Sequence, residues 1–596
     1  MQFEILQGVL AGLMFGLGAL LVTLLPKYKW LAASALCVLI TPIALLPMLL
    51  SYGDLGISDW DYYFSMHTNI RETITNYHQL PLWNPYTCGG TSALGDPEFP
   101  ALSPLFLLEL IFGTPTGLRL SIVVSTALGA LGMLHLARKL KIGPLGALVA
   151  SLGMSFGTVN LLEIVEGHQN ILAAMYIPWI LYCWYSAYRA EGRKKVLAII
   201  TTAILLALMF FQGGIYLLMY MAGVFVFLIL AAREKRTALI ITLAAGILAI
   251  GLAGIKLIPV ALWLTQFQDT QYASSAFTLW NIKDILLGRI LYGAEDIIPN
   301  QGGGWHEYGA YVGPVLLTLA GIGVALQRKR RIVRILAIGG ILALLVSACG
   351  PYFKPFFDAA PFIPRSNISR LILFTVIALS LLAGFSIDAI AKRSKRMHIY
   401  AIILLTLAAI DVMSLTYPLA SQAFVLPHVT NTIPQAPYPL AYSPFDYKTR
   451  YNGVDYTRAY DATLKGYGNM SYCSVIGPQP AVRIITDEGG TGILSLNDDP
   501  NATFSIKKWT PNKAVFEVTA TKTTSAILNT NYAKGWRING IPAKEITNRP
   551  GIQIEPDITT LEFSYIPPGL YAGIGVIIIN ILIILILLLK RFPPLI

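Results

Sequence analysis

The sequence has little charge for its length: 13% of its 596 residues are Asp, Glu, Lys or Arg, whereas 55% are hydrophobic. A soluble protein of this size could not keep so much apolar surface away from water, so that class is excluded. Apolar stretches of about 20 residues, the length that crosses a hydrocarbon core of about 30 Å, recur along the chain. The sequence therefore predicts an integral membrane protein that crosses the bilayer many times.

Cysteine is also scarce. The five cysteines are spaced singly, and Cys37, Cys183 and Cys349 lie inside apolar stretches. This spacing excludes a disulfide framework and a cysteine-ligated metal site, and it leaves Cys88 and Cys473 as the two that could pair. The sequence also lacks a Gly-rich phosphate-binding loop after a strand, which argues against a nucleotide-binding domain. The first apolar stretch has no basic region before it and no small-residue cleavage site, so we expect a retained helix rather than a signal peptide.

Thirteen apolar stretches are candidates for membrane-spanning helices. They cover residues 8–26, 31–50, 119–138, 143–163, 170–187, 195–212, 214–232, 237–262, 308–326, 332–349, 369–390, 398–418 and 571–589.

The basic residues predict the orientation of these helices. They form short clusters between the apolar stretches rather than one basic face, so the net charge of +12 indicates membrane topology and not nucleic-acid binding. With Lys27 and Lys29 in the cytoplasm, strict alternation places every other strong cluster on the same side: Arg138/Lys139/Lys141, Arg193/Lys194/Lys195, Arg233/Lys235/Arg236, Arg328–Arg331, Lys392–Arg396 and Lys590/Arg591. We therefore predict a protein of the cytoplasmic membrane with its N-terminus outside and its C-terminus in the cytoplasm. Four polar segments then lie outside: 51–118, 263–307, 350–368 and 419–570.

The predicted fold class is a polytopic α-helical membrane protein with a C-terminal extracytoplasmic β-sandwich before the last helix. Three parts follow: a transmembrane region over 1–418, a β-rich domain over 419–570, and a final helix with a short cytoplasmic tail over 571–596. The β-rich domain is predicted because polar and apolar residues alternate, with turn signals between the alternating runs. The alternating runs are Ala502–Trp509, Lys513–Thr521 and Thr560–Tyr565, and the turns are Thr510–Lys513 and Asn539-Gly540.

The first outer segment, 51–118, opens with acidic residues. Asp54, Asp59 and Asp61 follow the second predicted helix. A carboxylate held near a reacting centre can take the proton of an acceptor hydroxyl. Acidic residues beside a helix end are also common as solvated caps, and the spacing leaves both interpretations open. The apolar run Ser103–Gly113 is too short to cross a bilayer, so we expect an interfacial helix and a structured lid.

A series of short motifs runs through nearly the whole chain. The first outer segment contains Pro81-Leu82-Trp83-Asn84-Pro85-Tyr86, Gly89-Gly90-Thr91 and Ser103-Pro104. The helical region contains Gly167-His168-Gln169, Pro178-Trp179, Tyr308-Gly309-Ala310-Tyr311-Val312-Gly313, Arg365 and Arg370. The outer domain contains Trp509-Thr510-Pro511-Asn512, Asn531-Tyr532, Gly535-Trp536, Asn539-Gly540 and Tyr565-Ile566-Pro567. In this order and spacing, the motifs resemble the YfhO-like family of GT-C membrane glycosyltransferases.

The resemblance implies transfer of a sugar from a polyprenyl-phosphate-linked donor to an acceptor at the outer face of the membrane. It also implies a catalytic acidic residue in the first outer segment, for which Asp59 is the first candidate, Asp61 the second and Asp54 the third. The family pattern has one acidic residue here, so this sequence departs from it. Direct displacement of the phosphate would invert the anomeric carbon. A lipid-linked donor also requires a membrane-level cavity and cations for its phosphate.

Three basic residues are candidates for binding the donor phosphate: Arg370, Arg365 and Lys256. A guanidinium can grip phosphate oxygens through paired hydrogen bonds, although both arginines could instead reach lipid headgroups or pair with Asp358. Lys256 lies within a predicted span, where a charge is costly and marks a functional site by default. The alternative is that Lys256 lies near the outer end of its helix and reaches water.

Other polar residues of the outer segments are candidates for substrate binding: Asp96, Glu98, Glu166, His168, Glu307 and Tyr308. A histidine titrates near neutral pH and could assist proton transfer, although a histidine beside a glutamate is more often structural. The many outer Trp and Tyr residues could stack on sugars, but they also form the aromatic belt of any membrane protein.

Two other functions stay open. A lipid or glycan transporter would need charged residues along several spans, and the spans contain few. A non-catalytic subunit of an envelope complex would use 419–570 to bind a protein partner. The acceptor could be a glycan, a lipid or a protein. We predict no cofactor, because Asp59-Trp60-Asp61 is a weak match to a metal-binding acidic pair, and a divalent cation stays the alternative.

Overall fold

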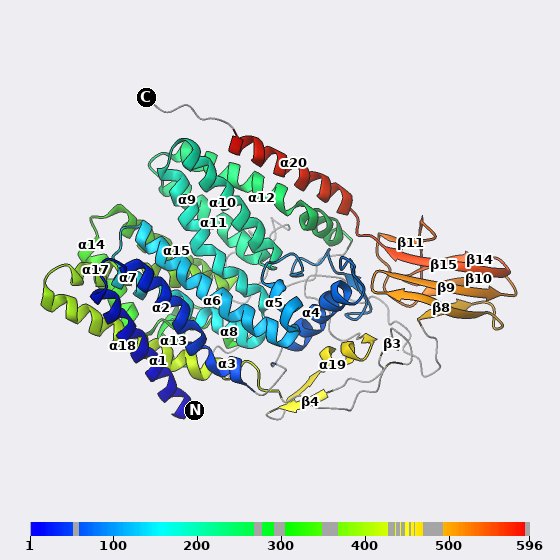
Figure 1. The fold of residues 1–596 in the computed structure, drawn as a ribbon, viewed down its shortest axis with the longest axis horizontal. Helices are drawn as coiled ribbons and strands as arrows, with labels where there is room; N and C mark the ends of the chain where they lie inside the picture. Colours follow the sequence, from blue (N-terminus) through cyan, green and yellow to red (C-terminus); the bar gives the residue numbers. More distant parts are fainter. Residues whose placement is uncertain are drawn as a thin grey trace.

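The chain is described by a computed structural model for residues 2–51, 56, 59–266, 277–290, 304–348, 368–426, 436, 441–442, 448–451, 454–457, 459–468 and 493–589. A helical region makes up most of the molecule, and a β-rich region projects from one end of it beside α4 (Trp60–Thr75), as Figure 1 shows.

The helical region is built from these further helices: α1 Gln2–Leu24, α2 Lys29–Ala44, α3 Leu46–Leu50, α5 Phe106–Phe112, α6 Thr114–Lys139, α7 Pro144–Phe156, α8 Thr158–Glu166, η1 Gln169–Met175, α9 Tyr176–Arg189, α10 Gly192–Phe211, α11 Ile215–Ala231, α12 Lys235–Leu264, η2 Leu279–Asn281, α13 Ile282–Leu287, η3 Trp305–Glu307, α14 Gly313–Gln327, α15 Arg331–Ala348, η5 Ile368–Leu371, α17 Ile372–Ala391, α18 Lys395–Ala420 and α20 Leu570–Leu589.

Nine helical segments in the described ranges are long and apolar enough to cross a membrane, and α2, α11 and α14 are shorter apolar helices. This supports an integral membrane protein, while the number of thirteen crossings stays a prediction. The segment formed by η5 and α17 is central, because 89% of its most apolar window is buried, whereas only 11% is buried in α20. The N-terminal helix α1 packs along α18.

Several of the predicted spans are not single helices; the predicted span 31–50, for example, is divided into α2 and α3 at Leu45. The predicted span 143–163 is divided into α7 and α8 at Gly157, which is extended, with φ of −63° and ψ of 157°. The predicted span 170–187 begins as the 3-10 helix η1 before α9 starts at Tyr176. Hydropathy averaged over a whole span could not show these breaks, because most residues of each span are apolar.

The last helix, α20, returns from the β-rich region and lies along α12 (Figure 1). Small residues permit this contact: a Cβ added at Gly573 would lie 2.4 Å from the carbonyl oxygen of Gly254. Close packing of this kind is how helices associate where lipid replaces water. The contact attaches the β-rich region to the helical region at its C-terminal end.

The β-rich region consists of two antiparallel sheets. Their strands are β7 Leu494–Asn497, β8 Thr503–Thr510, β9 Lys513–Ala520, β10 Thr524–Leu528, β11 Trp536–Ile538, β12 Ile541–Pro542, β13 Lys544–Ile546, β14 Arg549–Ile554 and β15 Asp557–Tyr565. The sheet orders are β13-β14-β10-β7 and β12-β11-β15-β9-β8. Phe516, Val518 and Phe563 of one sheet and Ala526 and Leu528 of the other belong to the same buried core. The predicted β structure before the last helix is therefore present, and its alternating runs form β8, β9 and β15.

The first outer segment is folded against this β-rich region. Asn512, in the turn between β8 and β9, accepts hydrogen bonds from the backbone N–H groups of Leu82 and Trp83, both at 3.0 Å. Asn531 donates to the carbonyl oxygens of Cys88 and Gly90 at 2.6 and 3.2 Å.

Aromatic rings fill the same interface. Trp83, in the short strand β1 (Trp83–Asn84), lies 5.1 Å from the ring of Trp536 and 4.6 Å from that of Tyr565. The motifs of the first outer segment and those of the outer domain therefore form one interface. Their structural role is to hold the outer domain on the segment that follows α4.

Candidate active site

Asp59, at the start of α4, is the candidate base of the first outer segment whose side chain faces a histidine. Its Oδ2 lies 3.1 Å from Nε2 of His168, and its side chain is 36% exposed. The backbone N–H of Asp59 donates to the carbonyl of Glu166 at 3.0 Å. Gly167 makes this approach possible, because its φ is +110° and a Cβ there would lie 2.5 Å from the nitrogen of Trp60. The turn after α8 thus holds Asp59 against His168.

His168 lies between two carboxylates. Its Nδ1 is 2.5 Å from Oε2 of Glu163, on the side opposite to Asp59. Burial and the Arg370 charge lower the pKa of His168, but the hydrogen bonds to Asp59 and Glu163 outweigh them, so this pKa lies well above 6.5. Burial raises the pKa of Asp59, and His168 more than offsets this, so the pKa of Asp59 lies below 3.8. The pair is therefore an imidazolium and a carboxylate.

Arg370, in η5, binds two further carboxylates. Its Nε and Nη2 donate to the two oxygens of Glu307 at 2.9 and 2.8 Å, which is a bidentate pair. Its Nε also lies 3.0 Å from Oε1 of Glu163. Nη2 is 3.0 Å from Nδ1 of His168, a contact rather than a hydrogen bond, because that nitrogen donates to Glu163. Arg370, predicted to bind phosphate, is here held by carboxylates of the protein.

A second histidine, His306, completes the cluster. Its Nδ1 lies 3.3 Å from Oε2 of Glu166, and its Nε2 lies 3.5 Å from Oε1 of Glu307. Burial lowers the pKa of His306, but Glu307 and Glu166 raise it above its usual value. Burial raises the pKa of Glu307, but Arg370 and His306 lower it by more, so this pKa lies well below its usual range. We call Asp59, Glu163, Glu166, His168, His306, Glu307 and Arg370 the charge cluster.

The charge cluster contains the described residues that could hold a metal ion. His168, His306 and Glu307 each offer one ligand atom, and the three atoms lie within 4.8 Å of one another.

Two buried acids lie next to the cluster. Glu98 accepts hydrogen bonds from the hydroxyl of Tyr63 and the amide of Asn170, both at 2.8 Å. The backbone N–H of Glu98 donates to Asp96, also at 2.8 Å. Burial, followed by the Glu98 charge, raises the pKa of Asp96 to about 7, and burial also raises the pKa of Glu98. These acids connect the Pro97 turn to η1, which begins directly after His168.

Lys256, predicted to bind phosphate, is fully buried in α12. Its Nζ donates to the carbonyl oxygens of Pro97, Phe99 and Phe210 at 2.8, 2.7 and 3.2 Å. An ammonium group has three donors, so these carbonyls use all of them. The structure gives Lys256 the role of fixing the turn that contains Asp96 and Glu98.

Asp61, the second candidate base, contacts the backbone of Ala459 and Tyr460 instead of the charge cluster. Its two oxygens accept hydrogen bonds from the backbone N–H groups of Ala459 and Tyr460 at 2.7 and 3.0 Å, at the start of α19 (Ala459–Leu464). The side chain is buried, with 2% exposure. Asp61 therefore anchors α19 on α4, and Asp59 stays the candidate base.

The other predicted residues have the following places. Tyr308 is buried with its ring 6.4 Å from that of Trp305, while Arg365 and Asp54 lie outside the described residues. Tyr63 and Asn170 were missed by the sequence analysis. They are neutral residues, and only their contacts with Glu98 show their place in the site.

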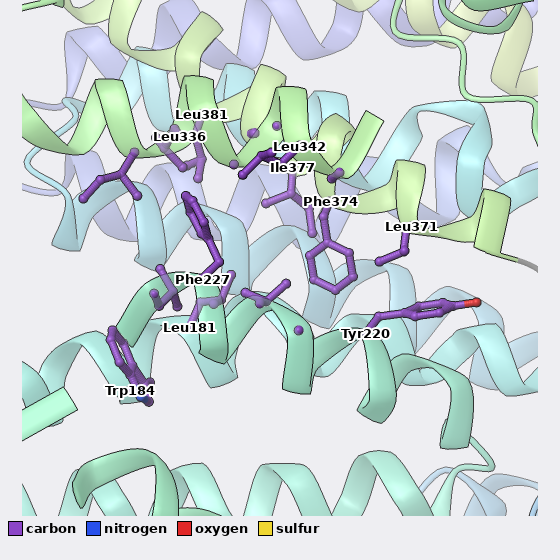
Figure 2. A pocket seen from close by; sticks show the side chains of 18 of the residues that line it. Leu181, Trp184, Tyr220, Phe227, Leu336, Leu342, Leu371, Phe374, Ile377 and Leu381 are labelled. Atoms are coloured by element: carbon purple, nitrogen blue, oxygen red, sulfur yellow. The ribbon is translucent and has the colours of Figure 1, made fainter. Parts of the chain in front are cut away.

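An apolar cavity of about 510 Å³ lies beside the charge cluster, between α9, α11, α15 and α17. Figure 2 shows Leu371, Phe374 and Tyr220 at one end of it and Trp184 at the other. Leu371 directly follows Arg370 in the sequence, so this end of the cavity adjoins the cluster. The site thus joins a charged centre to an apolar cavity within a membrane protein.

Comparisons with known proteins add two structures. No protein-family model and no curated protein sequence matches the chain. The mycobacterial arabinofuranosyltransferase AftD is similar at a TM-score of 0.44 and 18% identity, over 66% of this chain and 27% of that one. ArnT from Cupriavidus metallidurans bound to undecaprenyl phosphate is similar at 0.42 and 13%, over 70% and 84%. Both TM-scores are below 0.5, so the YfhO-like resemblance stays a prediction, and the function is inferred from the chain's own residues.

Proposed function

We propose that the chain is a membrane glycosyltransferase that moves a sugar from a polyprenyl-phosphate donor to a hydroxyl acceptor at the outer face of the membrane. The observation that carries this proposal is the charge cluster at the end of the apolar cavity. A lipid-linked donor has a long apolar chain and an ionised phosphate, and it needs such a cavity beside such a centre. The YfhO-like resemblance implies the same reaction.

Asp59 is the base in this proposal. As the acceptor hydroxyl attacks the anomeric carbon, its proton passes to the Asp59 carboxylate, the new glycosidic bond forms, and the bond from the anomeric carbon to the phosphate oxygen breaks. The attack comes from the side opposite the phosphate, so the anomeric configuration inverts. His168 holds Asp59 ionised and oriented, which is the state that a general base requires.

The departing polyprenyl phosphate carries negative charge, and Arg370 is the predicted phosphate ligand that lies in the charge cluster. Its donors contact Glu163 and Glu307. Binding of the phosphate would exchange one of these carboxylates for phosphate oxygens. We keep the remaining polar candidates, Asp96 and Glu98, as residues that shape the acceptor side of the site.

The proposed orientation places the first outer segment on the non-cytoplasmic side. Cys88 is disulfide-bonded. Disulfides persist in compartments outside the reducing cytoplasm, which supports this orientation. Cys473, its candidate partner, lies outside the described residues.

The experiment that tests the proposal is a transfer assay with purified protein and an undecaprenyl-phosphate hexose, in which release of undecaprenyl phosphate is measured. Asp59→Asn keeps the shape of the side chain but removes the base, so we expect the rate to fall about 100-fold or more. Glu72→Gln is the matched control, since Glu72 lies on the same helix near its other end and contacts Arg71 and Asn76. An Asp59→Asn variant that is as active as the control would overturn the proposal.

A further inference from the structure

Each histidine of the charge cluster lies between two carboxylates, with one ring nitrogen directed to each of them. For His168 these are Glu163 at 2.5 Å and Asp59 at 3.1 Å. For His306 they are Glu166 at 3.3 Å and Glu307 at 3.5 Å. A metal-binding histidine nearly always gives its second nitrogen to a carboxylate or carbonyl, which fixes the ring and raises its basicity. Glu163 and Glu166 are in the places that such supporting carboxylates occupy.

The ligand atoms are already close together. One atom each from His168, His306 and Glu307 lie within 4.8 Å of one another, and the two imidazole rings are 5.3 Å apart. The residues come from the turn after α8 and from η3, two segments that are far apart in the sequence. Both are fixed by further contacts, because η3 packs on α8 and His168 follows the Gly167 turn. Small side-chain movements would bring the three atoms onto one ion.

The charge of the cluster suits a divalent cation. Asp59, Glu163, Glu166 and Glu307 are four carboxylates, and Arg370 is the only permanent cation among the seven residues of the cluster. His168 is an imidazolium in the metal-free site, whereas metal ligation requires neutral imidazoles, so metal binding releases protons and the group then has three negative charges. A divalent ion would reduce this net charge of minus three to minus one. The site is largely closed to water, because its glutamate and arginine side chains are only 4–12% exposed.

We propose that His168, His306 and Glu307 bind one divalent transition-metal ion of the zinc or manganese class. Two imidazoles and a carboxylate are the ligands that these ions accept, whereas calcium and magnesium prefer oxygen ligands alone. Three protein ligands leave coordination positions open, as in catalytic metal sites. One part of the inference rests on the proposed function: the open positions take oxygens of the donor phosphate that lies beside Arg370, because all three donors of Lys256 already have protein partners.

The test measures metal binding to the purified full-length protein without any sugar donor. The protein is stripped with EDTA, loaded separately with zinc alone and manganese alone, desalted, and analysed for metal per chain. We expect one ion per chain for at least one of the two metals. In the His168→Gln/His306→Gln variant the affinity should fall by more than the 10- to 100-fold seen for loss of supporting residues.

The matched control is His78→Asn. His78 is exposed in the same outer segment as Asp59, and its φ of 51° is one that Asn tolerates. This variant should keep the ion. Retention of the ion by the double variant, or absence of a bound ion from the wild type, would overturn the proposal.

X-ray absorption spectroscopy of the zinc- or manganese-loaded wild type keeps the proposal testable if the double variant does not fold. Scattering from two imidazoles is expected, and a site without imidazole would contradict the assignment.

The proposed function and the proposed metal site can each be contradicted without the other. Undiminished transfer by metal-free protein would remove the phosphate-binding part and leave Asp59 as the base. A bound ion in a protein whose Asp59→Asn variant transfers normally would remove the base and leave the metal site.

Discussion

His168 and Asp59 are 109 positions apart in the sequence, yet Nε2 of the histidine lies 3.1 Å from Oδ2 of the aspartate. The contact exists because the turn at Gly167 packs directly on the start of α4. It joins the first outer segment to the segment after α8, and through Glu163 and Arg370 it reaches the start of α17. With η3, which supplies His306 and Glu307, four segments of the chain meet at one group of charges.

The protonation of His168 should appear in the stability of the metal-free protein. A histidine whose pKa is raised in the folded state contributes stability that is fully present below its unfolded pKa, about 6.5, and is lost as pH rises through the folded pKa. Between pH 6.5 and 9 the melting temperature of the wild type in EDTA should therefore fall more than that of His168→Gln. Scanning calorimetry in detergent measures this, and parallel curves would contradict the protonation state assigned to His168.

Substitution of Asp61 should lower the stability of the protein, whereas substitution of Asp59 should lower its transfer rate. Asp61→Ala removes the acceptor of two backbone N–H groups of α19, so we expect a loss of about 2–3 kcal/mol in the free energy of unfolding. Its transfer rate should fall far less than that of Asp59→Asn. Asp61→Asn keeps one acceptor and should lie between the wild type and Asp61→Ala in stability. Equal loss of transfer in Asp61→Asn and Asp59→Asn, with unchanged stability, would show that Asp61 is the base.

The apolar cavity can be filled without disturbing the fold. Gly223 lines it, and a Cβ added there meets no atom within 4 Å. Gly223→Leu should raise KM severalfold for a donor with a long polyprenyl chain and leave KM for a donor of two isoprene units nearly unchanged. Gly246→Leu is the matched control, because Gly246 is equally open but is not among the residues that line the cavity. If the KM for the long-chain donor were the same in Gly223→Leu as in Gly246→Leu, the lipid chain would bind elsewhere.

Asn512 should control the attachment of the β-rich region. Its side chain also donates to Gln79 and to the carbonyl of Leu80, in addition to the two bonds that it accepts. Asn512→Ala leaves buried backbone donors without partners, at a cost of about 1–3 kcal/mol for each unsatisfied group. Limited proteolysis should release the β-rich region faster from this variant than from Asn501→Ala, whose side chain is exposed. Equal release rates would show that Asn512 does not hold the interface.

The sequence predicted the membrane class and the β structure because both depend on local patterns. Hydropathy marks spans, and alternation marked the strands that became β8, β9 and β15. The breaks at Gly157 and in η1 were missed, because no change in hydropathy accompanies them.

The pairing of the charged residues could not be predicted. Sequence spacing does not show that Asp61 contacts α19 and Asp59 contacts His168, although the two aspartates are separated by one residue. In the same way, Lys256 is an intramembrane charge by position, but only its contacts with Pro97, Phe99 and Phe210 show that it fixes a turn. Long-range contacts decided these roles.

The central claim is that a polyprenyl phosphate binds with its chain in the apolar cavity and its phosphate at the charge cluster. Cryo-electron microscopy of the protein with undecaprenyl phosphate tests this most directly. The account predicts density for the chain between Tyr220 and Phe374 and for the phosphate beside Arg370, with Asp59 facing the open side of the phosphate. Lipid density confined to the outer surface of the helices, with the cavity and the cluster unchanged, would contradict it.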